Sequence, residues 1–454
     1  MSAPRSQPAA RTRAGSHAGL ARDPRLPQRD VLLDERAVAS RLSATLGANG
    51  QLAITDCERV RTKYRAGDSL RVLHRVRVGG VSYTVAARAY AAGESLRAYE
   101  RAAASAVDCA PLRGVLHDAE LETVFWTFPN DRKLAALSAL RDAAPGWARR
   151  LAPGWISSRV VAYAPEKCAT AECLDPRSRV VAYAKVYAGD EGRRVYDTYR
   201  ALARRLPTGD AEITIPRALA YDETHRTLLL APAAGARIAD LSDEELPRGY
   251  RRLGAALAAL HNAPAPEGLQ PFTRLDAGRL RRAARAIAGA RPDVRREACD
   301  LADELERRRA RHGAEPRVCL HGDVHSKNGI LRGERLTLID LDQCGTGHAA
   351  ADLGSLLASL TYSRLTADAA YSPADATAHP STHTQGGALA DAFLSGYSSV
   401  RELPAPESLR WHTAAALLAE RALRAVNRVR PEGLARLREL LREAAEILRK
   451  GGAR

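Results

Sequence analysis

Met, Phe and Lys are scarce in this sequence, and long apolar runs are absent from it. Its 454 residues include one Met and four Phe, and only six of the 69 basic residues are Lys. No run of about eighteen apolar residues occurs, so we predict no membrane-spanning helix. The first 30 residues are rich in Arg, Ala, Ser and Pro and lack the apolar core of a secretory signal. Because Arg is frequent throughout, we predict a disordered basic tail at 1–30 in preference to a mitochondrial transit peptide.

Cysteines are few and do not form the patterns that bind zinc. The seven cysteines show no C-x-x-C spacing, and Cys168 and Cys173 have neither a second pair nor a nearby His. A zinc site is therefore not predicted. An odd, scattered set of cysteines without a secretory signal predicts reduced thiols and a cytoplasmic location.

Acidic residues are outnumbered, and the formal net charge is +16. A basic chain suggests nucleic-acid binding as one hypothesis, since basic residues displace counterions from phosphate. Acids nevertheless lie between the arginines of most predicted helices, as in Arg295-Arg296-Glu297, which is typical of solvated helix faces. We therefore interpret the charge as a bias of composition and predict neither a nucleic-acid nor a membrane partner.

The stretch most informative about function is 319–328, which reads Cys-Leu-His-Gly-Asp-Val-His-Ser-Lys-Asn. An apolar segment at 336–341 follows it and ends in acids. A turn at Gly333-Glu334 predicts that two short strands pair there, which would bring their polar ends together.

Three polar side chains of this region match the needs of phosphoryl transfer. The reaction needs a group that positions the attacking hydroxyl and oxygen ligands for magnesium, of which protein usually supplies one or two. Asn328 and Asp340 fit the magnesium ligands, which leaves Asp323 for the acceptor hydroxyl.

The motif His321-Gly322-Asp323-x-His325-x-x-Asn328, followed by Ile339-Asp340, resembles the catalytic loop and metal-binding segment of a known family. This is the aminoglycoside phosphotransferase and choline kinase family, small-molecule relatives of protein kinases. The resemblance implies an α+β, two-lobed protein kinase-like fold, Mg²⁺ as cofactor, ATP as co-substrate and a small-molecule hydroxyl as phosphate acceptor. It also implies structural roles at the site for His321, His325 and Asp352, with Asp352 bracing the catalytic loop.

The role of Asp342 stays open at this point. It lies two residues after Asp340, so on a strand it would point to the same face. It could be a second metal ligand, a solvated acid or a hydrogen-bond anchor.

An internal similarity predicts that a small-lobe pattern occurs twice. Residues 85–94 align without a gap to 182–191, with Arg88 opposite Lys185. We interpret 31–154 as a degenerate small-lobe-like domain that serves as a cap or packing partner, because Arg88 replaces the lysine and no catalytic loop follows it. Chance similarity is the rival explanation, since Ala and Arg are abundant.

The second copy contains the predicted nucleotide-binding residues. The six residues 159–164 recur letter for letter at 179–184, and we expect these two strands to pair across the turn-rich residues between them. A basic residue on a strand followed by a helix with an acid is the layout of a kinase small lobe, which assigns Lys185 to the nucleotide phosphates. For its partner we favour Asp197 over Glu191, a choice left open. No G-x-G-x-x-G precedes Lys185.

The remaining boundaries follow from breaks in pattern. Ala231-Pro232-Ala233-Ala234-Gly235 is expected to be the hinge between lobes, where backbone groups of Ala231 and Ala233 bind the adenine edge. We predict the nucleotide-binding small lobe at 155–236, the helical catalytic large lobe at 237–454, and a mobile loop at 366–387.

The predicted activity is ATP-dependent transfer of the γ-phosphate to a hydroxyl of an antibiotic, sugar or amino alcohol. The alternative is a catalytically inactive kinase-fold scaffold. Aminoglycosides are cations, and the basic chain disfavours them. The acceptor, the choice between ATP and GTP, and the oligomeric state are not determined by the sequence.

Overall fold

The computed structural model describes residues 19–46, 53–140, 146–206, 213–309, 316–367 and 382–450. The predicted tail up to residue 18, and positions 368–381 of the predicted loop, lie outside the described residues. Among the described helices, none combines the length and the apolar character needed to cross a bilayer.

The first part of the chain forms a five-stranded antiparallel sheet, which we call the N-terminal sheet. Its strands lie in the order β1-β2-β3-β5-β4. The elements are α1 (Arg29–Leu33), α2 (Glu35–Leu46), β1 (Ile54–Arg65), β2 (Ser69–Val78), β3 (Val81–Ala89), α3 (Ser95–Ala103), β4 (Val115–Asp118) and β5 (Thr123–Thr127). Strands β2 and β3 form a hairpin, in which Val78 pairs with Val81 across two glycines that both have positive φ.

A second five-stranded antiparallel sheet follows, and we call it the second sheet. Its order is β6-β7-β8-β11-β10. The elements are α4 (Gly146–Leu151), β6 (Ser157–Ala164), β7 (Cys168–Leu174), β8 (Val180–Tyr187), α5 (Glu191–Ala203), β10 (Ala218–Asp222) and β11 (Thr227–Leu230). The two sheets therefore share one plan, in which a helix follows the third strand and the fifth strand pairs with the third. Arg88 lies on β3 and Lys185 on β8, the third strand of each sheet.

One expectation about the second sheet is wrong. The repeated segments 159–164 and 179–184 do not pair with each other, because β7 lies between them and pairs with both. Residues Ala169, Ala171 and Cys173 of β7 alternate as buried side chains. This period-two pattern makes the supposed turn region a strand.

The rest of the chain forms a mostly helical lobe with short strands at the site. The helices are α6 (Leu246–Asn262), α7 (Ala277–Ala290), α8 (Arg295–Arg309), α9 (Ala349–Ala367), α10 (Thr382–Ser398), α11 (Pro406–Ala416), α12 (Leu423–Arg428), α13 (Pro431–Ala435) and α14 (Leu437–Arg449). The strands are β9 (Ile213–Thr214), β12 (Ala236–Arg237), β13 (Arg317–Leu320), β14 (Gly329–Arg332), β15 (Arg335–Leu338) and β16 (Gly345–His348). β14 and β15 form the hairpin predicted at Gly333-Glu334.

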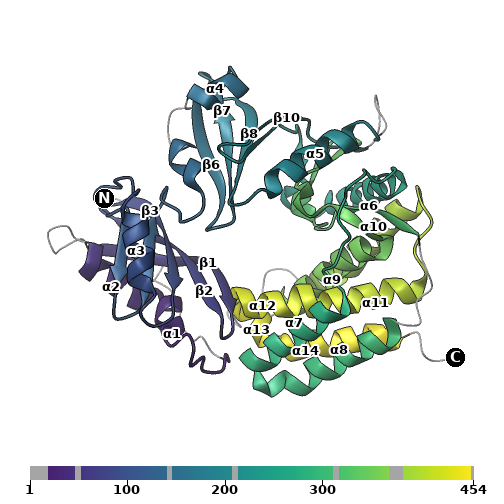
Figure 1. Ribbon diagram of the computed structural model, residues 1–454. Coiled ribbons are helices and arrows are strands. Elements are labelled where there is room, and N and C mark those ends of the chain that lie inside the picture. Colours follow the sequence, from purple (N-terminus) through teal and green to yellow (C-terminus); the bar gives the residue numbers. More distant parts are fainter. Residues whose placement is uncertain are drawn as a thin grey trace, which may run out of the picture.

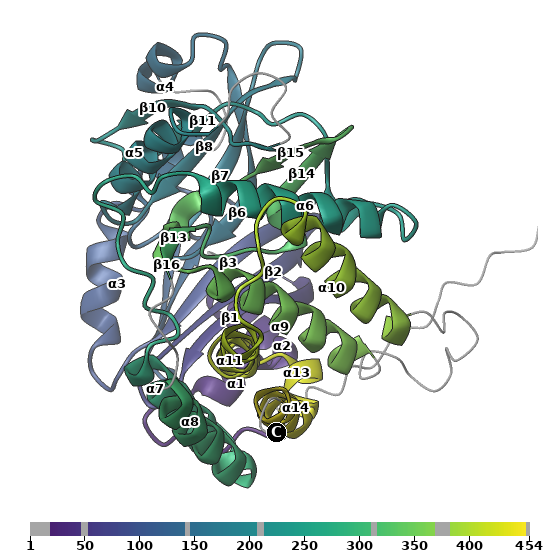
Figure 2. The ribbon, with the colours of Figure 1, turned by 90° about the vertical axis from the view of Figure 1, so that its right-hand side faces the viewer.

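The parts of the molecule encircle a central region, with the N-terminal sheet at the left, the second sheet at the top, and the helical lobe at the right and bottom (Figure 1). In the view turned by 90°, α7, α8, α11 and α14 gather below β13 and β16 (Figure 2). One buried cluster joins the N-terminal sheet to this bundle, as Val76, Val85, Ile287 and Leu417 illustrate. The N-terminal sheet is thereby packed against the lobe that holds the catalytic motif.

Candidate active site

The catalytic loop begins where β13 ends, and buried hydrogen bonds fix its backbone. Asp352, on α9, accepts from the backbone N–H groups of His321 at 2.7 Å and Gly322 at 2.9 Å. His261 Nε2 lies 3.2 Å from the same carboxylate. Gly322 has φ +79°, and a Cβ there would lie 2.1 Å from the carbonyl oxygen of Gln343. Only glycine fits this turn, and the bracing geometry expected of Asp352 is present.

His321 is fully buried and contributes through its ring nitrogens. The backbone N–H of Asp323 donates to His321 Nδ1 at 3.3 Å. Nε2 therefore holds the proton and donates to the carbonyl of Ile339 at 3.0 Å. His321 thus connects the loop to the segment that contains Asp340, which is a structural task.

Asp323 is a partly exposed carboxylate beside positive charge. Arg274 Nη1 lies 3.6 Å from its Oδ1 atom. Burial opposes ionisation of Asp323, but nearby positive charge, chiefly that of Arg274, outweighs it and lowers the pKa of Asp323 below the ordinary value. Asp323 is therefore ionised near neutral pH, as a group that accepts a hydroxyl proton must be. Burial also lowers the pKa of His325, so its imidazole is neutral.

Asn328 and Asp340 are joined by backbone geometry. Asn328 Nδ2 donates to the carbonyl of Asp323 at 3.0 Å, and the Asn328 carbonyl accepts from the N–H of Ile339 at 2.9 Å. Among the described residues, nothing donates to the Asn328 side-chain oxygen. Asp340 has φ +64°, which turns it out of the strand. The predicted strand at 336–341 is accordingly shorter, since β15 ends at Leu338.

Lys185 bridges the two lobes. Its Nζ donates to Asp340 Oδ1 at 2.7 Å and to Asp342 Oδ1 at 2.7 Å. Burial opposes its charge, but the two carboxylates raise its pKa. Burial and the charge of Asp340 raise the pKa of Asp342, although the charge of Lys185 opposes this shift. The hydroxyl of Tyr187 donates a hydrogen bond to Asp342 Oδ1 at 3.0 Å. Of the three readings of Asp342, this geometry is that of a hydrogen-bond anchor, reached through a 3₁₀ turn rather than a strand.

The structure does not bring Asp197 to Lys185, so that preference is wrong. Asp197 is half-exposed and pairs with Arg193 at 3.1 Å. The buried face of α5 contains Val195 and Tyr199, and Asp197 lies on the opposite face. The alternative, Glu191, lies in the first turn of α5. Lys185 instead pairs with carboxylates of the helical lobe.

A tight turn between β6 and β7 occupies the place of the missing glycine-rich loop. Its central residue, Glu166, has φ +58° and a buried carboxylate. That carboxylate lies 2.6 Å from Arg88, 2.9 Å from Arg132 and 3.2 Å from Arg71. The N-terminal sheet therefore holds the turn through charge-assisted contacts.

The expected hinge follows β11. The N–H of Ala231 donates to the carbonyl of Arg217 at 2.9 Å, so this group is not available to an adenine, contrary to expectation. The Ala231 carbonyl and both backbone groups of Ala233 make no hydrogen bond to any described residue. These three groups remain candidates for the adenine edge.

Two residues of the site, Arg274 and Glu420, were not predicted from the sequence. Arg274 lies between Asp323 and Glu420, with its Nη1 3.7 Å from Glu420 Oε1. Glu420 is buried and accepts from the hydroxyl of Ser355 at 2.6 Å. Arg274 had no signal, because Arg is abundant. Glu420 lies in a π-helical turn, Leu417–Ala422, a feature frequent at functional sites but invisible in a sequence.

The oxygen donors of the site fit a hard cation. Asn328 and Asp340 offer an amide and a carboxylate oxygen, and Mg²⁺ commonly takes one or two such ligands with phosphate oxygens and water. No group of three or more His, Cys, Asp or Glu side chains within the described residues is arranged to hold a metal by itself.

Comparisons with known proteins identify a family and several similar structures. The model of the phosphotransferase enzyme family matches residues 179–412, just over half of the chain. No curated protein matches. The chain is similar to a thermostable mutant of aminoglycoside phosphotransferase APH(4)-Ia in ternary complex with AMP-PNP and hygromycin B, with 16% identity, TM-score 0.48, and 68% of this chain and 98% of that chain covered.

Two further solved structures are similar. One is aminoglycoside phosphotransferase APH(3'')-Id from Streptomyces rimosus, with 19% identity, TM-score 0.42, and 67% and 98% of the two chains covered. The other is a choline/ethanolamine kinase family protein from Mesorhizobium loti, with 16% identity, TM-score 0.44, and 68% and 97% covered.

Proposed function

Because the chain belongs to the phosphotransferase enzyme family and is thus a small-molecule kinase, we propose that it transfers the γ-phosphate of ATP to a hydroxyl group of a small molecule. The observation that carries the proposal is the meeting of Lys185 with Asp340 at 2.7 Å, beside the loop that presents Asp323. This contact joins the second sheet to the helical lobe. A cation beside carboxylate oxygens supports the proposal, because phosphoryl transfer uses a cation on the phosphates and oxygen ligands for a metal.

Each residue has a defined task in the proposed reaction. Lys185 binds nucleotide phosphate oxygens and offsets the charge of Asp340. Asn328 and Asp340 would hold Mg²⁺, which when bound would neutralise charge on the transferring phosphate. Asp323 accepts a hydrogen bond from the acceptor hydroxyl and takes its proton. The hydroxyl oxygen bonds to the γ-phosphorus, the bond to the β-phosphate oxygen breaks, and ADP leaves.

The conservative substitution Asp323→Asn tests the proposal, because it keeps the shape of the side chain and removes its basicity. We expect turnover to fall by about 10²- to 10⁴-fold, the usual contribution of a general base. Titration calorimetry should find Mg·ATP binding unchanged, since Asp323 has no task in holding nucleotide. ADP release is measured with a panel of neutral, cationic and anionic hydroxyl compounds.

Asp303→Asn is the matched control, because this exposed residue on α8 is remote from the site. The control should behave as the unmodified protein in both measurements. Unchanged turnover in Asp323→Asn contradicts the assigned role. A protein that binds no Mg·ATP at all contradicts the proposed function and favours a scaffold.

A further inference from the structure

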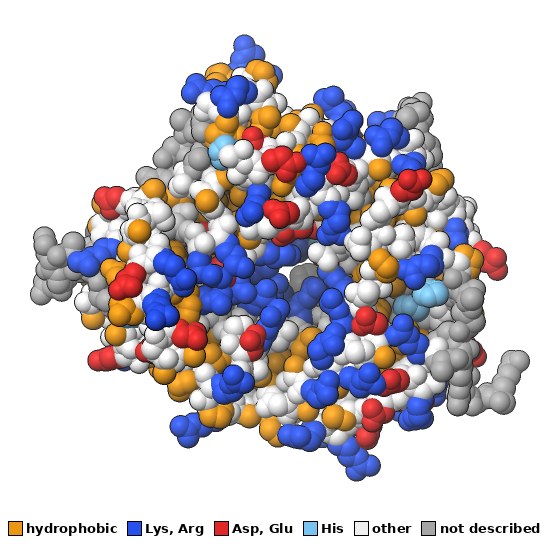
Figure 3. Space-filling view, in the orientation of Figure 1, with side chains coloured by type: hydrophobic (Ala, Val, Ile, Leu, Met, Phe, Trp, Pro, Cys, Tyr) orange, Lys and Arg blue, Asp and Glu red, His pale blue; other side chains and the backbone are white. Residues whose placement is uncertain are grey.

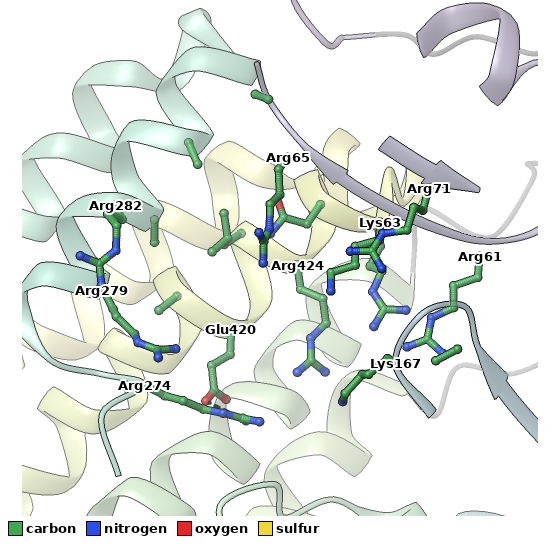
Figure 4. Close-up of a pocket in the computed structure, with 18 of the residues that line it drawn as sticks. Arg61, Lys63, Arg65, Arg71, Lys167, Arg274, Arg279, Arg282, Glu420 and Arg424 are labelled. Carbon is green, nitrogen blue, oxygen red and sulfur yellow. Dashed lines mark ion pairs between the residues drawn. The ribbon is translucent and has the colours of Figure 1, made fainter. Parts of the chain in front are cut away.

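A basic cavity of about 790 Å³ lies where the N-terminal sheet, the β6–β7 turn and the helical lobe meet. Lys and Arg side chains surround the hollow at the centre of the molecule (Figure 3), and the labelled side chains of the cavity reach toward one another from several elements (Figure 4). Its basic lining residues are Arg61, Lys63, Arg65, Arg71, Lys167, Arg274, Arg279, Arg282, Arg424 and Arg428. Glu420 is the one carboxylate among the described lining residues.

Most of these cations have no carboxylate partner among the described residues. Within the described parts of the chain, no acid pairs with Arg61, Lys63, Lys167, Arg279, Arg282, Arg424 or Arg428. Arg281, on the same helix as Arg279, does have an acidic partner and binds Glu306 at 2.6 Å. Composition bias explains why arginines are many, but not why seven basic side chains that pair with no described acid line one cavity.

The basic cavity reaches the reacting groups. Arg274 both lines it and lies 3.6 Å from Asp323 Oδ1. Lys167, in the turn that precedes β7, also lines the cavity. A ligand in the cavity can therefore place a hydroxyl against Asp323 while its charged groups contact the surrounding cations.

The remaining lining indicates what kind of anion fits. The described apolar lining residues are small or aliphatic, such as Ala66, Val72 and Leu423, and none is aromatic. Proteins that bind single-stranded nucleic acids stack bases on aromatic side chains, and this cavity offers no such surface. Closely spaced cations without stacking groups suit phosphate, sulfate or carboxylate groups on a compact molecule.

The free cavity is held in an unfavourable charge state. Burial and the positive charges of Arg71, Arg65, Lys167 and Arg428 lower the pKa of Lys63 to about 8. Burial and like charges, chiefly that of Arg61, also lower the pKa of Arg428. An anion that enters relieves this repulsion, whereas a cationic aminoglycoside would add to it.

We propose that the basic cavity binds the phosphate acceptor, and that this acceptor is a compact hydroxyl compound with several anionic groups, such as a phosphorylated sugar or polyol. The inference rests on the proposed function for its catalytic step. It assigns the N-terminal sheet a part in acceptor binding, through Arg61, Lys63 and Arg71.

Binding is tested with myo-inositol hexasulfate, which has no free hydroxyl and cannot be phosphorylated. Calorimetric titration is done with saturating Mg·AMP-PNP, so that the nucleotide site is occupied. We expect one bound hexasulfate in the unmodified protein and at least about tenfold weaker binding in the double variant Arg279→Ala/Arg282→Ala, which loses two charge-assisted contacts. Both side chains are exposed, so we expect the variant to fold.

Arg281→Ala is the matched control, because it removes the same side chain from the same helix on the side that faces Glu306. It should bind hexasulfate as the unmodified protein does. Equal binding by the double variant, or no binding by the unmodified protein, overturns the inference. Tight binding of single-stranded oligonucleotides in place of hexasulfate also overturns it, in favour of a nucleic-acid substrate.

The acceptor class is tested by ADP release with glucose 6-phosphate, fructose 1,6-bisphosphate and inositol phosphates, against glucose and kanamycin. We expect turnover only with anionic acceptors, and an increase in KM with little change in kcat for the Arg279→Ala/Arg282→Ala variant. Turnover with glucose or kanamycin alone overturns the inference and leaves the proposed function intact. Absence of Mg·ATP binding defeats the proposed function itself, so the two failures are distinguishable.

Discussion

Arg88 Nη1 lies 2.6 Å from the carboxylate of Glu166. This contact links the third strand of the N-terminal sheet to the turn that precedes β7 in the second sheet. Lys185, at the matching place in the second sheet, faces carboxylates of the helical lobe. Each basic residue thus reaches out of its own sheet. We propose that 31–154 is a degenerate copy of the small lobe that has become a cap, with Arg88 holding the turn.

Loss of the Glu166 carboxylate should destabilise the protein. In Glu166→Gln, three guanidinium groups lose the buried charge that they surround. We expect the free energy of unfolding to fall by about 2–3 kcal/mol, below the full cost of breaking a buried pair because the arginines are partly exposed. Denaturant unfolding measures the change. Glu58→Gln, which breaks the exposed pair with Arg75, is the control and should cost at most about 1 kcal/mol.

The same carboxylate predicts a pH dependence. Burial opposes ionisation of Glu166, but Arg132, Arg88 and Arg71 outweigh it and lower its pKa below the ordinary 4.5. A lowered pKa means that the unfolded chain binds the proton first. The stabilisation is therefore present above pH 4.5 and lost as the pH falls through the lower folded-state value. Glu166→Gln should lack this part of the acid sensitivity, and an identical acid profile in both proteins contradicts the role.

Lys185→Met should remove nucleotide phosphate binding. The substitution leaves Asp340 and Asp342 without their shared cation, and two adjacent carboxylates repel the nucleotide. We expect kcat/KM for ATP to fall by about 10²- to 10³-fold, as for loss of a preorganised electrostatic contact. Lys133→Met, at an exposed position remote from the site, is the control. Equal Mg·ATP affinity in Lys185→Met and the control would place the nucleotide elsewhere.

Asp340 and Asp342 should differ although both contact Lys185. Asp340 is the proposed magnesium ligand, so Asp340→Asn should raise the Mg²⁺ concentration needed for half-maximal rate by at least about 100-fold. Asp342 anchors Lys185 and Tyr187. Asp342→Asn should therefore raise the Mg²⁺ concentration needed for half-maximal rate by only about tenfold, the lower end of the effect for residues that orient a metal site. Rates measured across a Mg²⁺ titration separate the two. If Asp342→Asn shows the larger shift in Mg²⁺ requirement, the roles are reversed.

The motif at 321–328 could be recognised in the sequence because its polar residues lie close together along the chain. Asp323 and Asn328 lie five residues apart, and the hairpin that follows them brings Asp340 back to the same place. The partner of Lys185 was missed because it depends on packing between lobes. Helical periodicity places Asp197 on the outer face of α5. No pattern in the sequence shows that Asp342 contacts Lys185.

The basic cavity was missed for a different reason. Arginine is so frequent that Arg61, Arg279 and Arg424 carry no signal individually, and they are far apart in sequence. Only the packing of the N-terminal sheet against the helical bundle brings them to one space. The excess of basic residues is evident in the sequence. The interpretation of these residues as solvated helix faces is correct for paired residues such as Arg281, but it is wrong for the residues that line the cavity.

The pH dependence of anion binding should report Lys63. Its pKa in the free protein is about 8, lowered by burial and by Arg71, Arg65, Lys167 and Arg428. A bound anion raises this pKa, so binding takes up a proton above pH 8 and weakens as the pH rises. Affinity should fall by up to about tenfold for each unit by which the anion raises the pKa.

Hexasulfate is a suitable probe for this dependence, because its sulfate esters keep their charge across the range from pH 7 to 10. The titration is made in a Lys167→Arg background, so that Lys63 is the only amine among the described cavity residues. Lys63→Arg should then bind with an affinity that is nearly independent of pH, because a guanidinium keeps its charge. Lys63→Gln should bind more weakly at pH 7 and also show little dependence. The same decline with pH in Lys63→Arg would mean that another group titrates, and that Lys63 does not contact the anion.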